Sequence, residues 1–464
     1  MAIDKLVFDK RFLALALLTL AAVYWVPGAF RVSAIALAIV LVVLAPLPAA
    51  TRPVVSAVIL GLATGVASIN LFAPQIFQKH VIAEFGWQQP QFALATAIAT
   101  LVTVISSPLI GRLFDRQGVR RWAIVSIVLL AALLISLRWL TPNLWHLYLV
   151  MGLMPLLAAG TSSVAYSRII ARWFDRRRGQ AFGAALAGIG VGGAVLGPTI
   201  GWLIAHYGWR DAYASLGLLG LLLTLPVVLW ALRDSPAECG LGFDGLPAAA
   251  ATASNAPARP AVIYGYAAPE SRRQPRFWLM LMAFVIMSFG IGGVMVQLVP
   301  ILIARGIPEA TAVQTLGALS IGLIAGRAFA GFLMDRLFAP YVAATIVLLP
   351  AIGAALLAMG ADATGAFVAA MLVGLAAGAE LDVIAVLVTR YFGNRAYAEN
   401  YGWQYAAWTL GSGTGQLLTT AAYQRLGTHT QVLWLYATLF VISGVLVSRL
   451  GSYPDLAAPA AGKA

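Results

Sequence analysis

Two related stretches decide the fold of this chain: "GRLFDRQGVRR", from Gly111 to Arg121, and the shorter "GFLMDR", from Gly331 to Arg336. Each combines glycine, aspartate and arginine, and each follows a long apolar run. Only 10% of the 464 residues are charged, so charge is concentrated in a few short segments. The recurrence of one pattern in both halves predicts that the chain is built from two parallel repeats.

The composition indicates a membrane protein. Soluble domains are about 45–50% apolar, whereas 61% of this chain is hydrophobic and its mean hydropathy is +0.88. So much apolar surface requires lipid as the solvent for most of the length. The single cysteine, Cys239, excludes an internal disulfide and has no partner at metal-ligand spacing, so we expect no metal and no cofactor.

Apolar runs of roughly 20 residues, the length that crosses a bilayer, occur twelve times. Two shorter runs, 12–26 and 31–47, precede them and are joined by Pro27 and Gly28, which signal a turn. A cleaved signal peptide is the alternative for the first run, but small residues at cleavage spacing are missing. The sequence therefore predicts an all-α polytopic membrane protein of 14 spans. The twelve long spans are expected at 54–74, 91–111, 122–140, 146–170, 180–206, 212–232, 277–304, 311–333, 339–359, 364–389, 398–424 and 430–450.

The segment between the sixth and seventh long spans is rich in Ala, Pro and Ser and has no sustained periodicity, which is typical of a flexible linker. It divides the long spans into two sets of six. The expected organisation is an N-terminal helical hairpin at 1–50, a first six-helix bundle at 51–232, a cytoplasmic linker at 233–276, a second six-helix bundle at 277–451 and a flexible tail at 452–464.

The positive charges orient the spans. A net charge of +13 alone could indicate nucleic-acid binding. With the N-terminus in the cytoplasm, however, most of the 30 lysines and arginines fall in cytoplasmic segments and few in outer loops. Topology thus explains the charge, both termini are expected in the cytoplasm, and the bilayer rather than a nucleic acid is the expected partner.

The first charged stretch resembles the signature loop of the major facilitator superfamily. Four residues match that loop, and Val119 departs from it. A generic stop-transfer cluster is the alternative, but it does not explain the second copy. The resemblance implies the major facilitator fold, two six-helix bundles that rock around a midplane site, with the extra hairpin outside it. The residues expected to gate this motion are Gly111, Asp115, Arg116 and Gly118, together with Gly331, Asp335 and Arg336.

A second stretch, "YSRIIARWFDRRRGQAFGAALAGIGVGGAVLGP" from Tyr166 to Pro198, is similar to the fifth-span signature of bacterial relatives of the monocarboxylate transporters and oxalate–formate antiporters. Its glycines fit a dinucleotide-binding pattern literally, but no strand precedes them. We expect Gly193, Gly197 and Gly201 to serve close helix packing instead. A drug exporter is the alternative family member, although Trp202 breaks the exporter motif.

Three charged residues stand out inside the expected spans, where charge is costly and marks a functional site. Glu380 and Asp382 are two residues apart, about 200° around a helix, so they should face different sides. Both are candidates for proton coupling, and Glu380 is favoured. The resemblance implies that an eighth-span arginine binds the substrate carboxylate, and Arg327 occupies such a place, although Leu323 stands where animal monocarboxylate transporters carry aspartate. A purely structural ion pair is the alternative.

Polar and aromatic residues on neighbouring spans could complete a substrate cavity. The candidates are Asn70, Gln297, Tyr401, Gln404 and Trp408. Each has a structural alternative, because interfacial aromatics form belts and polar side chains hold helices together. Arg168, near the cytoplasmic end of the fourth span, is expected to extend its side chain to the interface.

The sequence therefore predicts a secondary transporter of the bacterial inner membrane. It should carry a small organic anion, which the resemblance implies is a monocarboxylate, with a proton or in exchange for another anion. No grouping of Ser, His and Asp suggests an enzyme. The alternatives are a proton-coupled drug or metabolite exporter and a non-transporting receptor or scaffold, against which the charges of Arg327 and Glu380 inside lipid argue. Substrate identity, direction and oligomeric state do not follow from the sequence.

Overall fold

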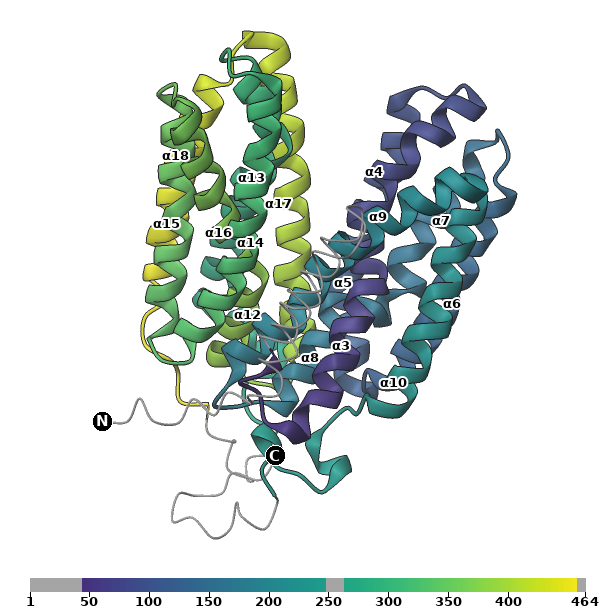
Figure 1. Ribbon diagram of the computed structural model, residues 1–464. Helices are drawn as coiled ribbons and strands as arrows, with labels where there is room; N and C mark the ends of the chain where they lie inside the picture. The colour runs from purple at the N-terminus through teal and green to yellow at the C-terminus, as the bar shows by residue number, and fades with distance from the viewer. Residues whose placement is uncertain (1–43, 248–262, 457–464) are drawn as a thin grey trace. The chain divides into compact units, whose positions relative to one another are not determined.

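The computed structural model describes residues 44–247 and 263–456, and nearly all of their regular structure is helical (Figure 1). Within these ranges, β-pairing is confined to two isolated bridges. The chain divides into unit 1, which ends at Val262, and unit 2, which begins at Ile263. The all-helical prediction is thus confirmed for the described residues. Most of the predicted hairpin at 1–50 lies outside them, as do the middle of the linker and the end of the tail.

Unit 1 contains eight helices in its described part, some of which form one span together. Several begin with residues suited to helix starts: Asn143 and Ser162 accept backbone N–H groups at the starts of their helices. The bounds are α3 Arg52–Thr64, α4 Val66–Phe85, α5 Gln89–Gln117, α6 Arg120–Ser136, α7 Leu144–Leu157, α8 Ser163–Trp173, α9 Arg178–Leu219 and α10 Leu225–Ala231.

Unit 2 consists of a short helix followed by six long ones in its described part. Asp362 accepts the N–H of Gly365 at the start of one long helix, and glycine with positive φ ends another at Gly427. The bounds are α12 Ala268–Arg273, α13 Pro275–Ile303, α14 Glu309–Met334, α15 Ala339–Ala358, α16 Ala363–Phe392, α17 Tyr397–Leu426 and α18 Thr430–Ser448.

Nine segments of the described chain are long and apolar enough to cross a membrane, fewer than the twelve long spans predicted. Three features account for the difference. The run from Arg178 to Ala231 counts once, although Gly208, with φ 80° and ψ 166°, breaks its helical backbone. The predicted fourth span is interrupted between α7 and α8, and α17 is more polar than the other long helices.

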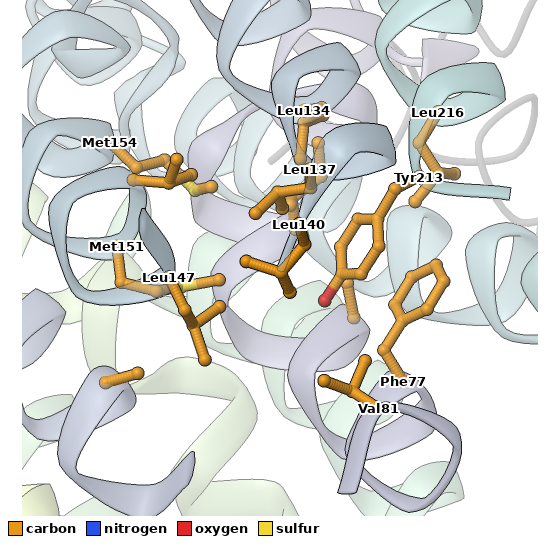
Figure 2. Close-up of a cluster of buried hydrophobic side chains, with 14 of the residues drawn as sticks. Phe77, Val81, Leu134, Leu137, Leu140, Leu147, Met151, Met154, Tyr213 and Leu216 are labelled. Carbon is orange, nitrogen blue, oxygen red and sulfur yellow. The ribbon is translucent and has the colours of Figure 1, made fainter. Parts of the chain in front are cut away.

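The buried core of unit 1 is formed by aliphatic and aromatic side chains from α4, α5, α6, α7 and α9 (Figure 2). Phe77 and Tyr213 stack with their ring centroids 3.6 Å apart, which joins α4 to the second part of α9. Leu134 and Leu147 bring α6 and α7 to the same cluster. Because lipid tails are as apolar as these side chains, the cluster is stabilised by van der Waals packing between the helices.

The glycines that bring α9 close to α3 differ from those predicted. A Cβ atom built on Gly188 would lie 2.5 Å from the carbonyl oxygen of Ile59, and one on Gly192 would lie 2.5 Å from that of Ala63. Of the three glycines predicted to serve close packing, Gly193 does so, because a Cβ atom there would lie 2.5 Å from the ring of Phe72 on α4. Gly197 and Gly201 have no atom within 4 Å of such a Cβ. The sequence thus predicted a stripe of glycines on α9 that allows close packing, but placed it on another face of the helix than the one that meets α3. Glycine spacing alone does not show which face of a helix meets a neighbour.

The segment predicted as a flexible linker is ordered at both described ends. In unit 1 the carboxylate of Asp244 accepts the backbone N–H of Arg176 at 3.0 Å, just before α9. In unit 2 the N–H of Tyr264 donates to the side chain of Asn394 at 2.9 Å, and α12 follows. The composition of the segment and its lack of periodicity indicate only that it forms no long helix or strand. They do not reveal that hydrogen bonds hold its first described end to unit 1 and its second to unit 2.

Candidate functional site

α14 and α16 pack backbone to backbone along a ladder of glycines. A Cβ atom on Gly374 would lie 2.2 Å from the carbonyl oxygen of Leu319, and one on Gly378 would lie 2.0 Å from that of Leu323. From the first contact to the second, both helices advance by four residues, about one turn. Any side chain at these positions would collide, so the glycines fix the register of the helices. On α14, Gly322 and Gly326 lie equally close to backbone atoms of α16.

One further turn along this glycine ladder leads to Arg327 on α14 and Asp382 on α16. Asp382 is fully buried, Arg327 is half-buried, and the two interact electrostatically. Within the described ranges, both carboxylate oxygens of Asp382 and Nη1 of Arg327 are buried without a hydrogen-bond partner. The two charges balance, but three polar atoms remain available to a ligand.

Glu380 has a different neighbour. Its side chain is 2% exposed and interacts with the indole of Trp408 on α17. Oε1 of Glu380 and Nε1 of Trp408 nevertheless both lack a well-formed hydrogen bond within the described part of the chain. The buried carboxylates of α16 therefore have separate partners: Asp382 has a guanidinium on α14, and Glu380 has an indole on α17.

The glutamines proposed for a cavity act between helices. Nε2 of Gln297 on α13 donates to Oγ1 of Thr420 on α17 at 2.8 Å. Nε2 of Gln404 on α17 approaches the carbonyl oxygen of Phe277 on α13 at 3.4 Å, while its Oε1 has no hydrogen-bond partner in the described residues. Both side chains join α13 to α17, so at least part of their polarity serves helix packing.

An aromatic column runs along α17. The ring of Tyr401 is fully buried and stacks between those of Tyr397, at 5.7 Å, and Tyr405, at 6.2 Å. Tyr405 in turn stacks on Trp408 with centroids 5.5 Å apart. Trp408, the last ring of the column, is the residue that interacts with Glu380. Unit 2 thus holds Arg327, Glu380, Asp382 and all the candidate cavity residues except Asn70, which is half-buried on α4 of unit 1.

The first charged stretch is the centre of an ion-pair cluster in unit 1. Nε of Arg168 on α8 lies 3.0 Å from Oδ1 of Asp115 at the end of α5, and Nη1 lies 3.7 Å from Asp234 after α10. Arg168 is only 1% exposed, so the prediction that it extends to the interface is wrong. Two carboxylates reach its guanidinium inside the protein and neutralise it there.

Gly118 and Val119 are explained by the same cluster. Gly118 has φ +82°, and a Cβ atom there would lie 2.7 Å from Oδ2 of Asp234. The backbone N–H of Val119 donates to Oδ1 of Asp234 at 2.6 Å, and the N–H of Arg120 follows at 3.3 Å. Because the loop uses the backbone of Val119, the absence of a basic side chain there leaves this contact intact. Gly111 is buried on α5, whereas Arg116 is exposed.

The second charged stretch has a simpler geometry. Gly331 is buried on α14, and Asp335 directly follows the last residue of that helix. The guanidinium of Arg336 lies over the ring of Phe332, 3.5 Å from its centroid. Arg336 therefore contacts a residue of its own helix, whereas the first charged stretch is joined to α8 and to Asp234.

Sequence reasoning missed three features of these sites. Asp234 lies in the segment predicted as a linker, and Arg168 is predicted as an interfacial residue. The third feature is the glycine ladder, whose signal in the sequence is the spacing of glycines four apart on both expected spans, "GLIAG" at 322–326 and "GLAAG" at 374–378. Without knowledge of which helices touch, the spacing could not be assigned to a pair.

Comparison with known proteins agrees with this architecture. A family model described as Major Facilitator Superfamily matches residues 55–416. The uncharacterised MFS-type transporter YhjX of Escherichia coli K12 is 26% identical over 349 residues, which cover 74% of this chain and 82% of that protein.

Animal monocarboxylate transporters match over shorter ranges. Monocarboxylate transporter 12-B of Danio rerio is 26% identical over 277 residues, 56% of each chain. Human monocarboxylate transporter 11 is 33% identical over 160 residues, 33% of this chain and 34% of that protein. The matches thus span about half or less of these transporters.

Solved structures share the fold at low sequence identity. The E. coli fucose:proton symporter FucP has a TM-score of 0.61 and 13% identity, with 87% of this chain and 98% of that chain covered. The human organic anion transporter MFSD10 has a TM-score of 0.61 and 16% identity, with 86% and 100% covered.

Proposed function

Because this chain belongs to the Major Facilitator Superfamily, a class of membrane transporters rather than enzymes, we propose that it carries a small organic monoanion by alternating access. The anion, a monocarboxylate in this proposal, binds Arg327 and moves with a proton. The names of the monocarboxylate transporter relatives support the substrate class. One observation carries the proposal: Arg327 on α14 and Asp382 on α16 lie at the same level of the glycine ladder and interact.

The proposed coupling follows from charge balance. In the empty site, Arg327 is neutralised by Asp382, its neighbour on α16. An arriving carboxylate would place two negative groups around one guanidinium in a site that excludes water, which is costly. A proton on Asp382 removes the excess charge and frees the guanidinium for a bidentate bond to the substrate. Anion and proton therefore enter together. Glu380, favoured from the sequence alone, is the second candidate for the proton.

We also propose a topology for the whole chain. It comprises fourteen spans, with an N-terminal hairpin at 1–50 ahead of six-helix bundles at 51–232 and 277–451, a cytoplasmic linker at 233–276 and a tail at 452–464. The location is the bacterial inner membrane with both termini in the cytoplasm. The clusters around Gly111, Asp115, Arg116 and Gly118 and around Gly331, Asp335 and Arg336 gate the cytoplasmic side. Asn70, Gln297, Tyr401, Gln404 and Trp408 shape the cavity in this proposal.

The proposal is tested with sealed proteoliposomes that contain a pH-sensitive dye. Gradients of lactate, pyruvate, formate and acetate are applied in turn. We expect one acid to acidify the lumen faster than it does in protein-free liposomes. The Arg327→Gln variant should lose at least ~10-fold of this rate, while Arg425→Gln, the same change at an exposed arginine, should keep it.

A second variant distinguishes transport of the substrate anion from transport of the proton. Asp382→Asn should retain exchange of labelled substrate across the membrane but lose the coupled proton flux, because an amide cannot take the proton. If Glu380→Gln has this phenotype and Asp382→Asn does not, the proton role belongs to Glu380. A proton flux evoked by tetraphenylphosphonium but by none of the acids would overturn the proposal in favour of cation export. Anion exchange without any proton flux in the unmodified protein would refute proton coupling.

A further inference from the structure

Several spans of unit 1 are interrupted. The first is broken at Gly65, whose extended backbone, with φ −87° and ψ −178°, separates α3 from α4. The fourth is broken between α7 and α8 by residues 158–162. The sixth contains a π-helical turn, Gly220–Thr224, before α10. In Figure 1, α3 and α8 lie below the breaks of their spans and α4 and α7 lie above them. We refer to these three interruptions as the break belt.

Threonine hydroxyls join the breaks to one another. Oγ1 of Thr161 in the fourth span accepts the N–H of Val66, the first residue of α4, at 3.0 Å. Oγ1 of Thr64, at the end of α3, lies 2.6 Å from Oγ1 of Thr224 in the π-helical turn. The first contact satisfies a backbone N–H that an unbroken helix would bond within itself, and the second joins two side chains. The three interruptions form one connected layer through unit 1.

A serine on an unbroken neighbour supports the fourth-span break. Oγ of Ser126 on α6 accepts the N–H of Gly160 at 3.0 Å and donates to the carbonyl oxygen of Leu157 at 2.7 Å. Gly160 also passes so close to α6 that a Cβ atom there would lie 2.4 Å from the carbonyl oxygen of Trp122. One hydroxyl therefore bridges the end of α7 and the turn that leads to α8.

The break belt borders a small cavity with room for about one water molecule. Its lining includes Gly65 and Thr161 from two of the breaks and Gly220 from the third. Interiors are normally packed too densely for elements to shift without strain. Unfilled space beside three interrupted helices gives the segments on either side room to move.

The corresponding helices of unit 2 have no such layer within the described residues. α13, α16 and α18 each run without interruption through 29, 30 and 19 residues. Ser443 of α18 does bond the carbonyl oxygen of Ala283 on α13 at 2.7 Å, but between continuous helices. A polar contact between helices is thus common to the two units, whereas among these described helices the breaks occur in those of unit 1.

We propose that the break belt is a hinge inside unit 1, about which α4 and α7 pivot against α3 and α8. Hydroxyl bonds hold the hinge in one arrangement and can be exchanged as it moves. Asn70, five residues beyond Gly65 on α4, moves with the pivoting part. The described part of unit 2 lacks this device, so the two repeats contribute differently to the conformational cycle. The inference does not depend on the identity of the substrate.

The test measures distances within each unit by pulsed electron paramagnetic resonance on the full chain in nanodiscs. Cys239→Ser removes the native thiol. Spin labels at Lys79→Cys on α4 and Val125→Cys on α6, both exposed, span the break belt. Labels at Leu337→Cys and Arg425→Cys, also exposed, span unit 2 and serve as the control. We expect a distance distribution at least twice as wide in unit 1 as in unit 2.

A matched pair of glycine substitutions distinguishes a hinge from a static kink. Gly220→Ala places a methyl group in the cavity without a clash, since the nearest atom to its Cβ is 3.9 Å away. It should narrow the unit 1 distribution, while Gly197→Ala, whose Cβ has no atom within 4 Å, should leave it unchanged. Thr161→Val, which removes the acceptor for Val66, should widen it. Equal widths in the two units, or no narrowing in Gly220→Ala, would overturn the proposal.

Discussion

Arg168 shows how strongly a single residue can depend on its partners. Its guanidinium is buried between Asp115 and Asp234 and also contacts the backbone oxygen of Asp115 at 3.3 Å. A buried pair of this kind adds little net stability compared with apolar residues, but removing one partner leaves an uncompensated charge. Arg138 provides a contrast, because its ion pair with Asp211 is 2.8 Å long and largely exposed.

The Arg168→Gln substitution should therefore destabilise the protein by about 3–5 kcal/mol. Arg138→Gln, the same change in an exposed pair, should cost no more than about 1 kcal/mol. Thermal unfolding in detergent measures both. The double variant Arg168→Gln with Asp115→Asn should recover part of the loss, since both charges are then absent. Equal effects of the two single changes would contradict the burial of charge as the cause.

His429 makes stability depend on pH. Its ring stacks on Tyr423 with centroids 4.2 Å apart just before α18, and it is 4% exposed. Burial, with a contribution from the nearby positive charge of Arg305, lowers the pKa of His429 from its usual value of 6.5. The unfolded chain then binds a proton more readily than the folded one, so stability is full above pH 6.5 and is lost as pH falls below it.

We expect the melting temperature to fall between pH 7 and pH 5, and a His429→Gln variant to show a shallower decline. His80→Gln, at an exposed histidine, should follow the unmodified protein. A pH dependence that is unchanged in His429→Gln would assign the effect to other groups.

At the scale of elements, the glycine ladder holds α14 and α16 at backbone contact and so determines which side chains meet at its end. Gly378 faces the carbonyl oxygen of Leu323 with no room for a methyl group. Gly317, on the same α14, has no atom within 4 Å of a built Cβ. The two positions look alike in sequence, yet only one lies in the contact.

Gly378→Ala should separate the helices and cost about 1–3 kcal/mol, as overpacking does, with transport reduced more than stability alone explains. Gly317→Ala should be close to neutral. Unfolding temperatures and initial transport rates, normalised to the amount of folded protein, measure the two effects. A tolerated Gly378→Ala would show that the register has other determinants.

The sequence predicted helices well and their contacts poorly. Long apolar runs located the helical segments, since each is recognisable from local composition. The sequence does not predict the break between α7 and α8, because the apolar pattern continues through Ala158 and Gly160 although the α-helical backbone ends at Leu157. Arg327 and Asp382 are predicted at a similar depth, because each lies eight residues before a charged residue at the cytoplasmic end of its span. That the two interact follows only from the register of α14 on α16.

At the scale of the whole molecule, orientation in the membrane can be read with the native thiol. Cys239 is exposed in unit 1, in a segment that the charge distribution assigns to the cytoplasm. A membrane-impermeant maleimide should label it in inside-out vesicles and leave it unlabelled in right-side-out ones. Lys79→Cys in a Cys239→Ser background should show the opposite pattern. Labelling of Cys239 from outside would reverse the proposed topology.

The glycine ladder has a consequence for the uniqueness of the fold. A repeat of four residues on both helices is self-similar: sliding α14 by one turn would again bring glycines to the facing helix. After such a slip, however, Arg327 would face Gly378 or Val386, and Asp382 would face Gly331 or Leu323. Each charge would lose its counter-charge in lipid. Arg327 and Asp382 thus select one register among near-equivalent ones, as a single buried polar residue does in a coiled coil.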